Sequence, residues 1–353
     1  MAKDTSSVTR TIGLDLGDRH SHFCSLDPSG EVEQQGRLRT TREALARLFE
    51  GRERCRVVLE AGSQSAWVAE QLEAWGHEVL VANPRQLAAI YAQPTKSDAI
   101  DAETLARLGR ADPKLLRPIR PRRPGTLADR AVLRSRALAV RCRTQLINHV
   151  RGTVKALGAR LPACSTTAFA RRVQGELPEA LRPALEPVLD LIQQLSDQVR
   201  AYDGQIERLG AERYPETALL RQVPGVGATT ALAFVLTIED PLRFPRSRIV
   251  GSYLGLRPRR DQSGARDPQM RITKAGDREL RRLLVQAAQY QLGPFGPDTD
   301  LRRFGQRLAA RGGKAARKRA VVAVARKTAV LLHRLWVTGA VYEPLYHSAR
   351  PVD

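Results

Sequence analysis

The stretch Thr11-Ile-Gly-Leu-Asp-Leu-Gly17 opens the first folded part of the chain and decides its fold class. An apolar run that ends in a glycine predicts a buried strand followed by a turn. Two further strands are predicted at 20–26 and 31–39, with Asp27-Pro-Ser-Gly30 as the hairpin turn between them. The chain therefore begins with a three-stranded meander.

Helices and strands alternate after the meander. The apolar spacing predicts helices at 41–49, 64–75, 85–91 and 97–108, and strands at 56–60 and 77–82. The order begins β-β-β-α-β-α-β-α, which is typical of an RNase H-like domain. The expected fold class is α/β plus α, with a domain at 8–112, a basic linker and long helices at 113–215, and a mostly helical domain at 216–353.

The charge of the chain is large and unevenly distributed. The 353 residues include 58 Lys+Arg and 37 Asp+Glu, a net charge of +21, yet the first 100 residues have a net charge of −2. No acidic residue occurs between Leu301 and Tyr342. Such a charge indicates a polyanionic partner, with nucleic acid first and an anionic membrane surface second. The alternative, an Arg-rich genome composition, would not spare the first hundred residues.

Several classes of protein are disfavoured by composition. No run of about 18 apolar residues exists and the first ten residues are polar, so we expect no membrane span and no secretory signal. The four cysteines are far apart and form no CxxC pair, which disfavours a disulfide framework and a cysteine zinc site. A cytoplasmic location fits this cysteine usage.

The middle of the chain has the pattern of a linker followed by long helices. Residues 113–124 contain four prolines and five basic residues, which predicts a stiff, basic linker. A long Arg-rich helix is expected at 126–157. Apolar residues then recur at steps of three and four, as in a coiled coil: Val188, Leu191, Leu195, Val199, Tyr202, Ile206 and Leu209. This seam could join two copies of the chain or close a helix hairpin within one copy.

A second folded part begins near residue 216. Pro224-Gly-Val-Gly227 opens a predicted helix, as in a helix-hairpin-helix element. There Gly225 and Gly227 would let backbone N–H groups approach a phosphate without reading sequence. The alternative is an ordinary turn at the start of a helix. Helices are also predicted at 277–291 and 314–336.

Four carboxylates in the first domain form a candidate site. Asp15 ends the first strand, Glu60 ends the fourth, and Asp98 and Asp101 share one face at the head of a helix. In an RNase H-like sheet these positions converge, and two Mg²⁺ ions about 3.5–4 Å apart would neutralise their repulsion. Taken singly, Asp98 could be a helix cap and Asp15 part of a strand-end turn.

Two motif sets together resemble a known family. Gly-Leu-Asp15-Leu-Gly, Leu-Glu60-Ala-Gly and Lys96-Ser-Asp98-Ala-Ile-Asp101-Ala resemble the DEDD transposases of the insertion-sequence one-ten family. Val-Pro-Gly-Val-Gly-Ala-Thr-Thr-Ala, Tyr-Leu-Gly255-Leu-Arg-Pro, Ser263-Gly and Ile-Thr-Lys-Ala-Gly276-Asp are similar to its second domain. The resemblance covers nearly the whole chain.

This resemblance implies a RuvC-like domain and a serine-bearing transposase domain that move insertion sequences by recombination. Ser263 matches the nucleophile of the family. The resemblance also implies a structured non-coding RNA, the bridge RNA, that pairs with donor and target DNA. It further implies dimers and tetramers with sites shared between protomers, acting in bacteria at the nucleoid. The chain departs from the family's usual Ser-Gly-Gly-Lys, because it has Ser263-Gly-Ala-Arg266.

The surroundings of Ser263 fit this role better than the Ser-Gly pair itself, which is a common turn. Cations would stabilise the phosphorane oxygens when a serine attacks a phosphodiester. The six basic residues nearby in sequence are Arg257, Arg259, Arg260, Arg266, Arg271 and Lys274. No histidine lies near enough in sequence to act as a base. We interpret His20, His22, His149 and His333 as structural or surface residues.

Three other functions remain open from the sequence. A hydrolytic RuvC-like nuclease, such as a junction resolvase, would use the four carboxylates without Ser263. A sugar kinase or ATPase of the actin-like class shares the strand-Asp-Gly start, but it needs a duplicated domain and a second glycine-rich nucleotide motif. An RNA-binding scaffold with a decayed site would not need the complete carboxylate set.

Overall fold

The computed structural model describes residues 10–84, 97–263, 268 and 270–347. The chain divides into two compact units, residues 1–127 and residues 128–353. The helix predicted at 85–91 lies outside the described residues. Within the described part of the chain, no helix has both the length and the apolar composition that crossing a membrane requires.

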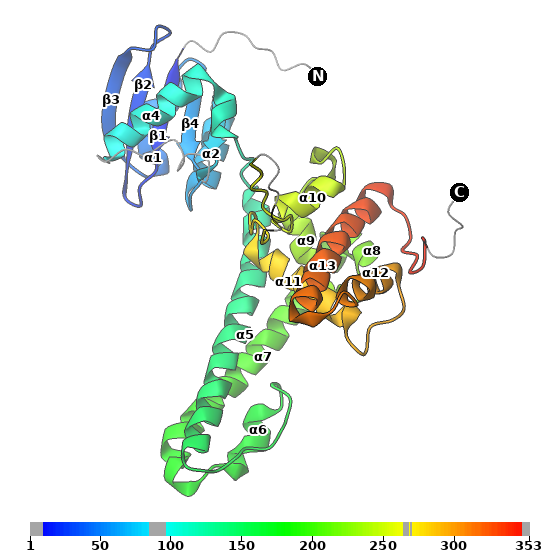
Figure 1. The fold of residues 1–353 in the computed structure, drawn as a ribbon. Coiled ribbons are helices and arrows are strands. Elements are labelled where there is room, and N and C mark those ends of the chain that lie inside the picture. The colour runs from blue at the N-terminus through cyan, green and yellow to red at the C-terminus, as the bar shows by residue number, and fades with distance from the viewer. Residues whose placement is uncertain (1–9, 85–96, 264–267, 269, 348–353) are drawn as a thin grey trace. The chain divides into compact units, whose positions relative to one another are not determined.

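A five-stranded mixed sheet forms the centre of the first unit (Figure 1). Its strands are β1 Thr11–Asp15, β2 His20–Leu26, β3 Val32–Arg39, β4 Arg56–Glu60 and β5 Glu78–Ala82, in the order β3-β2-β1-β4-β5. β1, β2 and β3 form the predicted meander with antiparallel pairing, whereas β4 runs parallel to β1 and to β5. The predicted strands are confirmed, with small differences at their ends.

Helices cover both faces of this sheet. On one face α1 (Arg42–Phe49) and α2 (Ser65–Ala74) bury their apolar side chains against alternate residues of β1 and β4, such as Ile12 and Leu59. On the other face lies α4 (Asp98–Ala111). Gly13 allows α4 to approach closely, because a Cβ there would lie 1.9 Å from the carbonyl oxygen of Ala102.

The first residues of the proline-rich segment after α4 pack on the sheet. The short 3-10 turn Pro113–Leu116 (η1) fully buries Leu116. Beyond it, the backbone N–H of Ile119 donates a 2.8 Å hydrogen bond to the carbonyl of Val81. The segment predicted as a linker therefore begins as part of the first unit.

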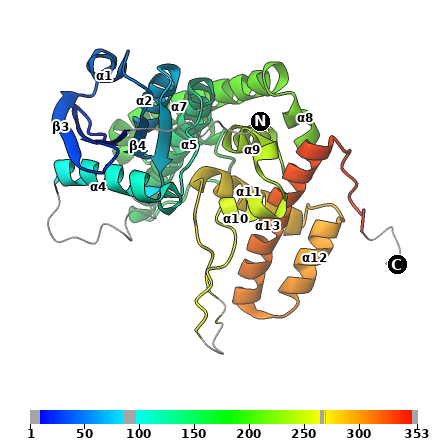
Figure 2. The ribbon, with the colours of Figure 1, turned by 90° about the horizontal axis from the view of Figure 1, so that it is seen from above.

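Two long helices, α5 (Pro124–Ala156) and α7 (Arg182–Glu212), run side by side (Figures 1 and 2). Their distal ends enclose a core with α6 (Phe169–Val173), followed by the 3-10 turns 174–176 and 179–181. As a seam within one copy of the chain, the predicted apolar series of α7 is only partly buried, since Leu191 is 49% exposed. The buried seam includes Leu189, Ile192 and Ser196 instead. A purely apolar pattern misses this seam because the polar Ser196 belongs to the packed face.

Among the described residues after α7, the second unit has six helices and one 3-10 turn. They are α8 Glu216–Leu220, α9 Ala228–Ile238, η4 Pro241–Arg243, α10 Arg248–Tyr253, α11 Arg278–Leu292, α12 Asp300–Ala309 and α13 Gly313–Thr338. Nearly every residue of α9 is buried, and α11 and α13 pack around it (Figure 2). The fold is therefore mixed α/β with a five-stranded sheet and many helices, as the sequence predicts at this level of detail.

Candidate functional site

Asp15 and Glu60 lie at adjacent strand ends. β1 and β4 are parallel neighbours with Leu14 opposite Leu59, so Asp15 and Glu60 are the next residues on each strand. The carboxyl ends of parallel strands meet at one edge of a sheet, where neighbouring strands are about 4.8 Å apart. The strand topology therefore places the two carboxylates side by side.

The start of α4 brings two further carboxylates toward this edge. The Ser97 hydroxyl caps the helix by accepting a hydrogen bond from the backbone N–H of Ile100, and Asp98 and Asp101 lie in the first turn. His22 pairs with Asp15 across β1 and β2, and its Nδ1 lies 3.6 Å from a carboxylate oxygen of Asp98. Asp98 is thus linked through His22 to the strand that carries Asp15.

The pKa of Asp15 is raised by its burial and by the neighbouring carboxylates. Burial is the largest cause that raises the pKa of Asp15, to about 6, and the negative charges of Asp98, Asp101 and Glu60 raise it further. His22 acts in the opposite direction but does not outweigh them. The side chain of Asp98 is 71% exposed, so the cluster is open to solvent on that side. The four predicted carboxylates are therefore near enough to interact electrostatically.

The donor chemistry of this cluster suits a hard divalent cation, because carboxylate oxygens are the ligands that Mg²⁺ prefers. Across the described residues, no three His, Cys, Asp or Glu side chains are gathered closely enough to hold a metal ion together. The carboxylates thus have the right chemistry, and their side chains would have to converge further around an ion.

Ser263 lies on an extended hairpin of the second unit. Backbone hydrogen bonds of 2.9 Å join Arg259 N–H to the Arg271 carbonyl and Thr273 N–H to the Arg257 carbonyl. Pro258 and Ile272 pair between them. Ser263 is exposed, as are five of the six predicted cations, namely Arg257, Arg259, Arg260, Arg271 and Lys274. Arg266 lies outside the described residues.

The base of this hairpin is tightly built. Gly255 and Gly276 each have a φ of +68°, and a Cβ on either would lie 2.2 Å from a backbone atom, of Ala275 and Tyr253 respectively. Lys274 has a φ of +55°, a conformation that side chains other than glycine adopt at a cost of roughly 1 kcal/mol. The guanidinium of Arg281 donates to the carbonyls of Leu254 and Ala275, which belong to the two sides of the base.

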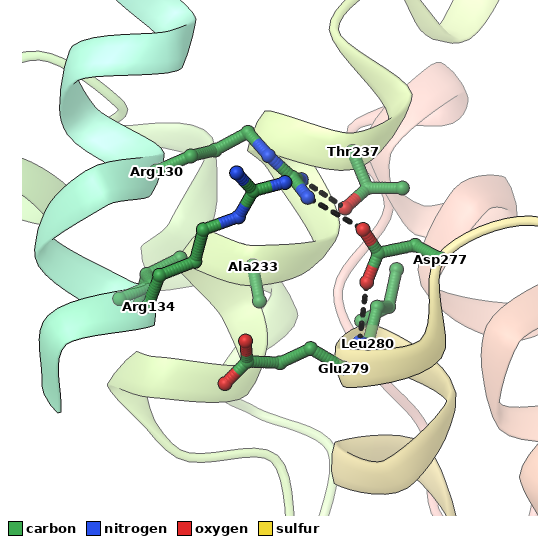
Figure 3. A pocket seen from close by; sticks show the side chains of 8 residues that line it. Arg130, Arg134, Ala233, Thr237, Asp277, Glu279 and Leu280 are labelled. Carbon is green, nitrogen blue, oxygen red and sulfur yellow. Dashed lines mark hydrogen bonds and ion pairs between the residues drawn. The ribbon is translucent and has the colours of Figure 1, made fainter. Parts of the chain in front are cut away.

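A buried ion pair anchors the helix that follows the hairpin (Figure 3). Arg130 of α5 is 5% exposed and donates to the carboxylate of Asp277 and, at 2.8 Å, to the Thr237 hydroxyl. Asp277 also caps α11 by accepting from the backbone N–H of Leu280. These residues, with Arg134 and Glu279, line a hollow of about 10 Å³, which is room for one water molecule. The hollow is structural rather than a substrate site.

Another ion pair involves Asp129, the residue that precedes Arg130 on α5. Asp129 is 5% exposed and accepts from the guanidinium of Arg213, at 2.7 Å, and from the hydroxyl of Tyr214. Burial, followed by the hydrogen bond to Asp129, raises the pKa of Tyr214 to about 12. Asp129 and Asp277 are therefore each paired with an arginine.

The predicted helix-hairpin-helix segment forms a tight turn before α9. Gly225 has a φ of +81°, and Gly227 is the N-cap of α9 without a side chain to cap the helix. The side-chain amide of Gln291 on α11 donates a 2.8 Å hydrogen bond to the carbonyl of Pro224. Gly225 and Gly227 are both exposed, so the backbone at this helix N-terminus is accessible.

Sequence reasoning misses two parts of these sites. The pattern around His22 indicates a structural or surface residue, yet His22 lies beside Asp98 at the carboxylate cluster. Its position opposite Asp15 follows from the hairpin register, which is the signal that could have indicated it. The Arg130–Asp277 pair is also missed, because its members are 147 residues apart and no local pattern joins them.

A nuclease-like α/β unit with carboxylates at its sheet edge, joined to a basic helical unit, defines an enzyme that acts on nucleic acid. Residues 12–158 match a transposase family model, and residues 217–300 match that of the transposase IS116/IS110/IS902 family. The chain belongs to this family, which is the insertion-sequence one-ten family expected from the motifs, and it is a DNA transposase or recombinase.

Three relatives illustrate the similarity. A protein of Sinorhizobium fredii named as transposase y4pF/y4sB is 30% identical over 80% of this chain and 73% of its own length. A protein of Pseudomonas aeruginosa named as a family 20 transposase is 29% identical, over 94% of this chain and 98% of its own length. The transposase for insertion sequence element IS1111A of Coxiella burnetii is 27% identical, over 94% and 91%.

Proposed function

We propose that this transposase cuts and rejoins the DNA of an insertion sequence by transesterification, with Ser263 as the nucleophile. The observation that carries the proposal is the placement of Ser263, exposed on a hairpin whose flanking residues are cationic and whose base is fixed. A phosphodiester brought to this hairpin would meet a hydroxyl and several guanidinium groups together. Arginine suits this task because it presents fixed donors to phosphate oxygens.

In the proposed step, the Ser263 oxygen attacks the phosphorus of one DNA strand. The bond from phosphorus to the departing sugar oxygen breaks, and that oxygen takes up the proton that the serine loses. The product is a serine phosphodiester, so no bond energy is lost to hydrolysis. Attack by another DNA hydroxyl reverses the step and joins a new strand, without a nucleotide cofactor.

The cluster of Asp15, Glu60, Asp98 and Asp101 is the proposed magnesium site, within an RNase H-like, RuvC-like domain. The support is the raised pKa of Asp15, because burial and three neighbouring carboxylates make the ionised form of Asp15 unfavourable, and a bound cation would offset this. Bound Mg²⁺, in one or two ions, would polarise the phosphodiester and lower the pKa of a nearby hydroxyl. His22 would hold Asp98 in place from the neighbouring strand.

Guidance by a structured non-coding RNA, and assembly into dimers or tetramers, complete the proposal. The support for an RNA partner is the surplus of positive charge, since 46 of the 58 basic residues follow residue 100. Base pairing between such an RNA and both donor and target DNA would carry sequence recognition. The protein itself would then contact mostly backbone.

The alternative is a hydrolytic RuvC-like metal nuclease, favoured by the strand order of the first unit and by the carboxylates at its edge. The two functions differ in the fate of the cut strand. We would incubate the protein with RNA and labelled DNA, denature it, and look for DNA that migrates with protein until protease is added. Wild type and the control Ser252→Ala should form this adduct, and Ser263→Ala should not.

Cleavage by Ser263→Ala at the wild-type rate, with free ends, would reject Ser263 as the nucleophile and favour the hydrolytic nuclease.

The salt dependence of binding tests separately whether the partner is a nucleic acid. Affinity for RNA and DNA should fall steeply between about 50 and 200 mM salt, because phosphate contacts release counterions. Affinity that hardly changes across this range would contradict the nucleic-acid assignment.

A further inference from the structure

The outer face of α11 carries an unusual set of exposed residues. Arg278, Arg282, Gln286 and Tyr290 recur at steps of four and are all exposed, so they form one stripe along the helix. The stripe begins one residue after Asp277, where the Ser263 hairpin ends, and finishes beside the Pro224–Gly227 turn. It thus connects the two elements of this unit that the sequence assigns to nucleic acid.

The aromatic ring at the end of the stripe is held in place on one side and open on the other. Gly225 is so close that a Cβ there would lie 3.1 Å from Cδ1 of the Tyr290 ring. Tyr290 is nevertheless 47% exposed. A ring that is backed by a glycine turn and open to solvent is a surface on which a nucleobase can stack.

A second exposed aromatic residue follows on the loop after α11. Phe295 is 83% exposed, the highest value among the large hydrophobic side chains of the described residues. Its loop is nevertheless anchored, because the guanidinium of Arg302 donates to the carbonyls of Gln291 and Gly293. A Cβ on Gly296 would lie 2.2 Å from the Gln291 carbonyl oxygen, so the loop packs directly on the end of α11.

Charge and geometry together favour a single nucleic-acid strand as the partner of this stripe. Arg278 and Arg282 can meet phosphates, exposed backbone N–H groups lie at the start of α9, and the only acidic residue of α11, Glu279, pairs with Arg282 at 3.6 Å. From Arg278 to Tyr290 the helix rises about 18 Å, since each residue adds about 1.5 Å. That length matches about five nucleotides at 3.4 Å each.

We propose that single-stranded DNA binds along α11, with one unpaired base stacked on Tyr290, a second aromatic contact at Phe295, and its backbone running toward the base of the Ser263 hairpin. DNA is chosen over RNA because this helix continues directly from the hairpin that is proposed to cut DNA, and in this respect the inference rests on the proposed function. The stripe would hold the strand at a fixed distance from the nucleophile.

The test measures binding of a short fluorescein-labelled oligodeoxyadenylate to the full-length protein. Tyr290→Ala should weaken binding about 5- to 100-fold, the usual loss for one stacked base, without changing the slope of affinity against salt. Tyr290→Phe should bind like wild type. Tyr290→Leu, which still fills the space beside Gly225, should be weakened. Arg282→Gln should lower the salt slope by about one.

Two controls separate stacking from other effects. Leu242→Ala removes a 76% exposed apolar side chain from a different part of this unit and should leave binding unchanged. An abasic site at the stacked position should weaken wild type and add no further loss to Tyr290→Ala, because both changes remove the same contact. Independent, additive losses would overturn the stacking assignment.

The proposal would also be overturned by equal losses for Tyr290→Phe and Tyr290→Ala. Tighter binding of oligoadenylate RNA with the same dependence on Tyr290 would assign the stripe to RNA instead. The covalent-adduct assay tests Ser263 separately. Loss of the adduct in Ser263→Ala together with wild-type binding of the oligonucleotide would concern the proposed function, whereas wild-type binding in Tyr290→Ala would reject the stripe alone.

Discussion

The two units of this protein differ in the surroundings of their partly or fully buried carboxylates. In the second unit, Asp129 and Asp277 are each paired with an arginine and with a hydroxyl or backbone N–H group. In the first unit, burial and the charges of three nearby carboxylates raise the pKa of Asp15 to about 6. Pairing stabilises the ionised form of a carboxylate, whereas crowding with like charges raises the free energy of the ionised form.

The largest expected effect follows from removing one member of the crowded set. Glu60→Gln should reduce strand exchange to about one per cent of wild type or less, because a ligand for the proposed cation is lost while the shape of the side chain is kept. Strand exchange is measured on paired DNA substrates, with circular dichroism to check folding. Glu78→Gln, on the neighbouring strand β5 and paired with Arg56, is the matched control and should retain activity. Full activity of Glu60→Gln, or of wild type in a chelator, would show that the crowded carboxylates of the first unit do not act through a metal ion.

The next largest effect should come from breaking a pair in the second unit. Asp277→Asn keeps the cap on α11 but leaves the Arg130 guanidinium, 5% exposed, without its counter-charge. We expect a loss of about 3–5 kcal/mol in the free energy of unfolding, measured by urea denaturation. Asp298→Asn, whose carboxylate pairs with Arg303 at the surface, should lose less than about 1 kcal/mol. Equal losses would show that burial does not distinguish these pairs.

A change of the opposite sign is expected at Asp15. Because its pKa is raised, the folded state favours the neutral carboxyl, and ionisation at neutral pH costs stability. Asp15→Asn should therefore stabilise the protein by about 1–2 kcal/mol in a chelator, after allowance for partial exposure. Thermal unfolding at pH 7 measures this difference. Asp27→Asn should destabilise instead, since the Ser29 hydroxyl and nearby backbone N–H groups lower the pKa of Asp27. A lower stability of Asp15→Asn would contradict the claim that ionised Asp15 destabilises the fold.

The smallest effect concerns alkaline pH in the second unit. The pKa of Tyr214 is raised from 10 to about 12, so the folded state holds its proton longer than the unfolded chain does. The stabilisation by this group is complete below pH 10 and is lost as the pH rises through 12. The melting temperature of wild type should fall more steeply between pH 10 and 12 than that of Tyr214→Phe. Parallel curves would mean that Asp129 does not hold the tyrosine proton.

Much of the first unit could be predicted from sequence because its signals are local. The strands at 20–26 and 56–60 and the helix at 41–49 depend on short patterns of apolar residues, and they are confirmed. The placement of Asp15 and Glu60 at neighbouring strand ends follows from the strand order alone. The hairpin register places His22 opposite Asp15, but its contact with Asp98 also depends on how α4 packs over the sheet, which no local pattern predicts.

The second unit is harder to predict because its decisive contacts are long-range and polar. Ser196 occupies the buried seam of α7, where its hydroxyl donates to the carbonyl of Ile192 and accepts a 3.3 Å bond from Arg143. A search for apolar residues skips such a position and selects exposed Leu191 instead. The roles of Ser263 and the four carboxylates in catalysis stay predictions.

Because Ser263 lies far from the base of its hairpin, a small rotation at the base displaces it by a large distance. Ser263 lies six residue steps beyond Arg257, so the arm extends about 20 Å at about 3.3 Å per residue. A rotation of about 10° at its base would move the hydroxyl by about 3.5 Å, as far as the separation of two reacting atoms. The position of the proposed nucleophile therefore depends on Gly255, Gly276 and Arg281, which hold the base of the arm. Substitutions at these three positions would displace the Ser263 hydroxyl without altering any residue near it.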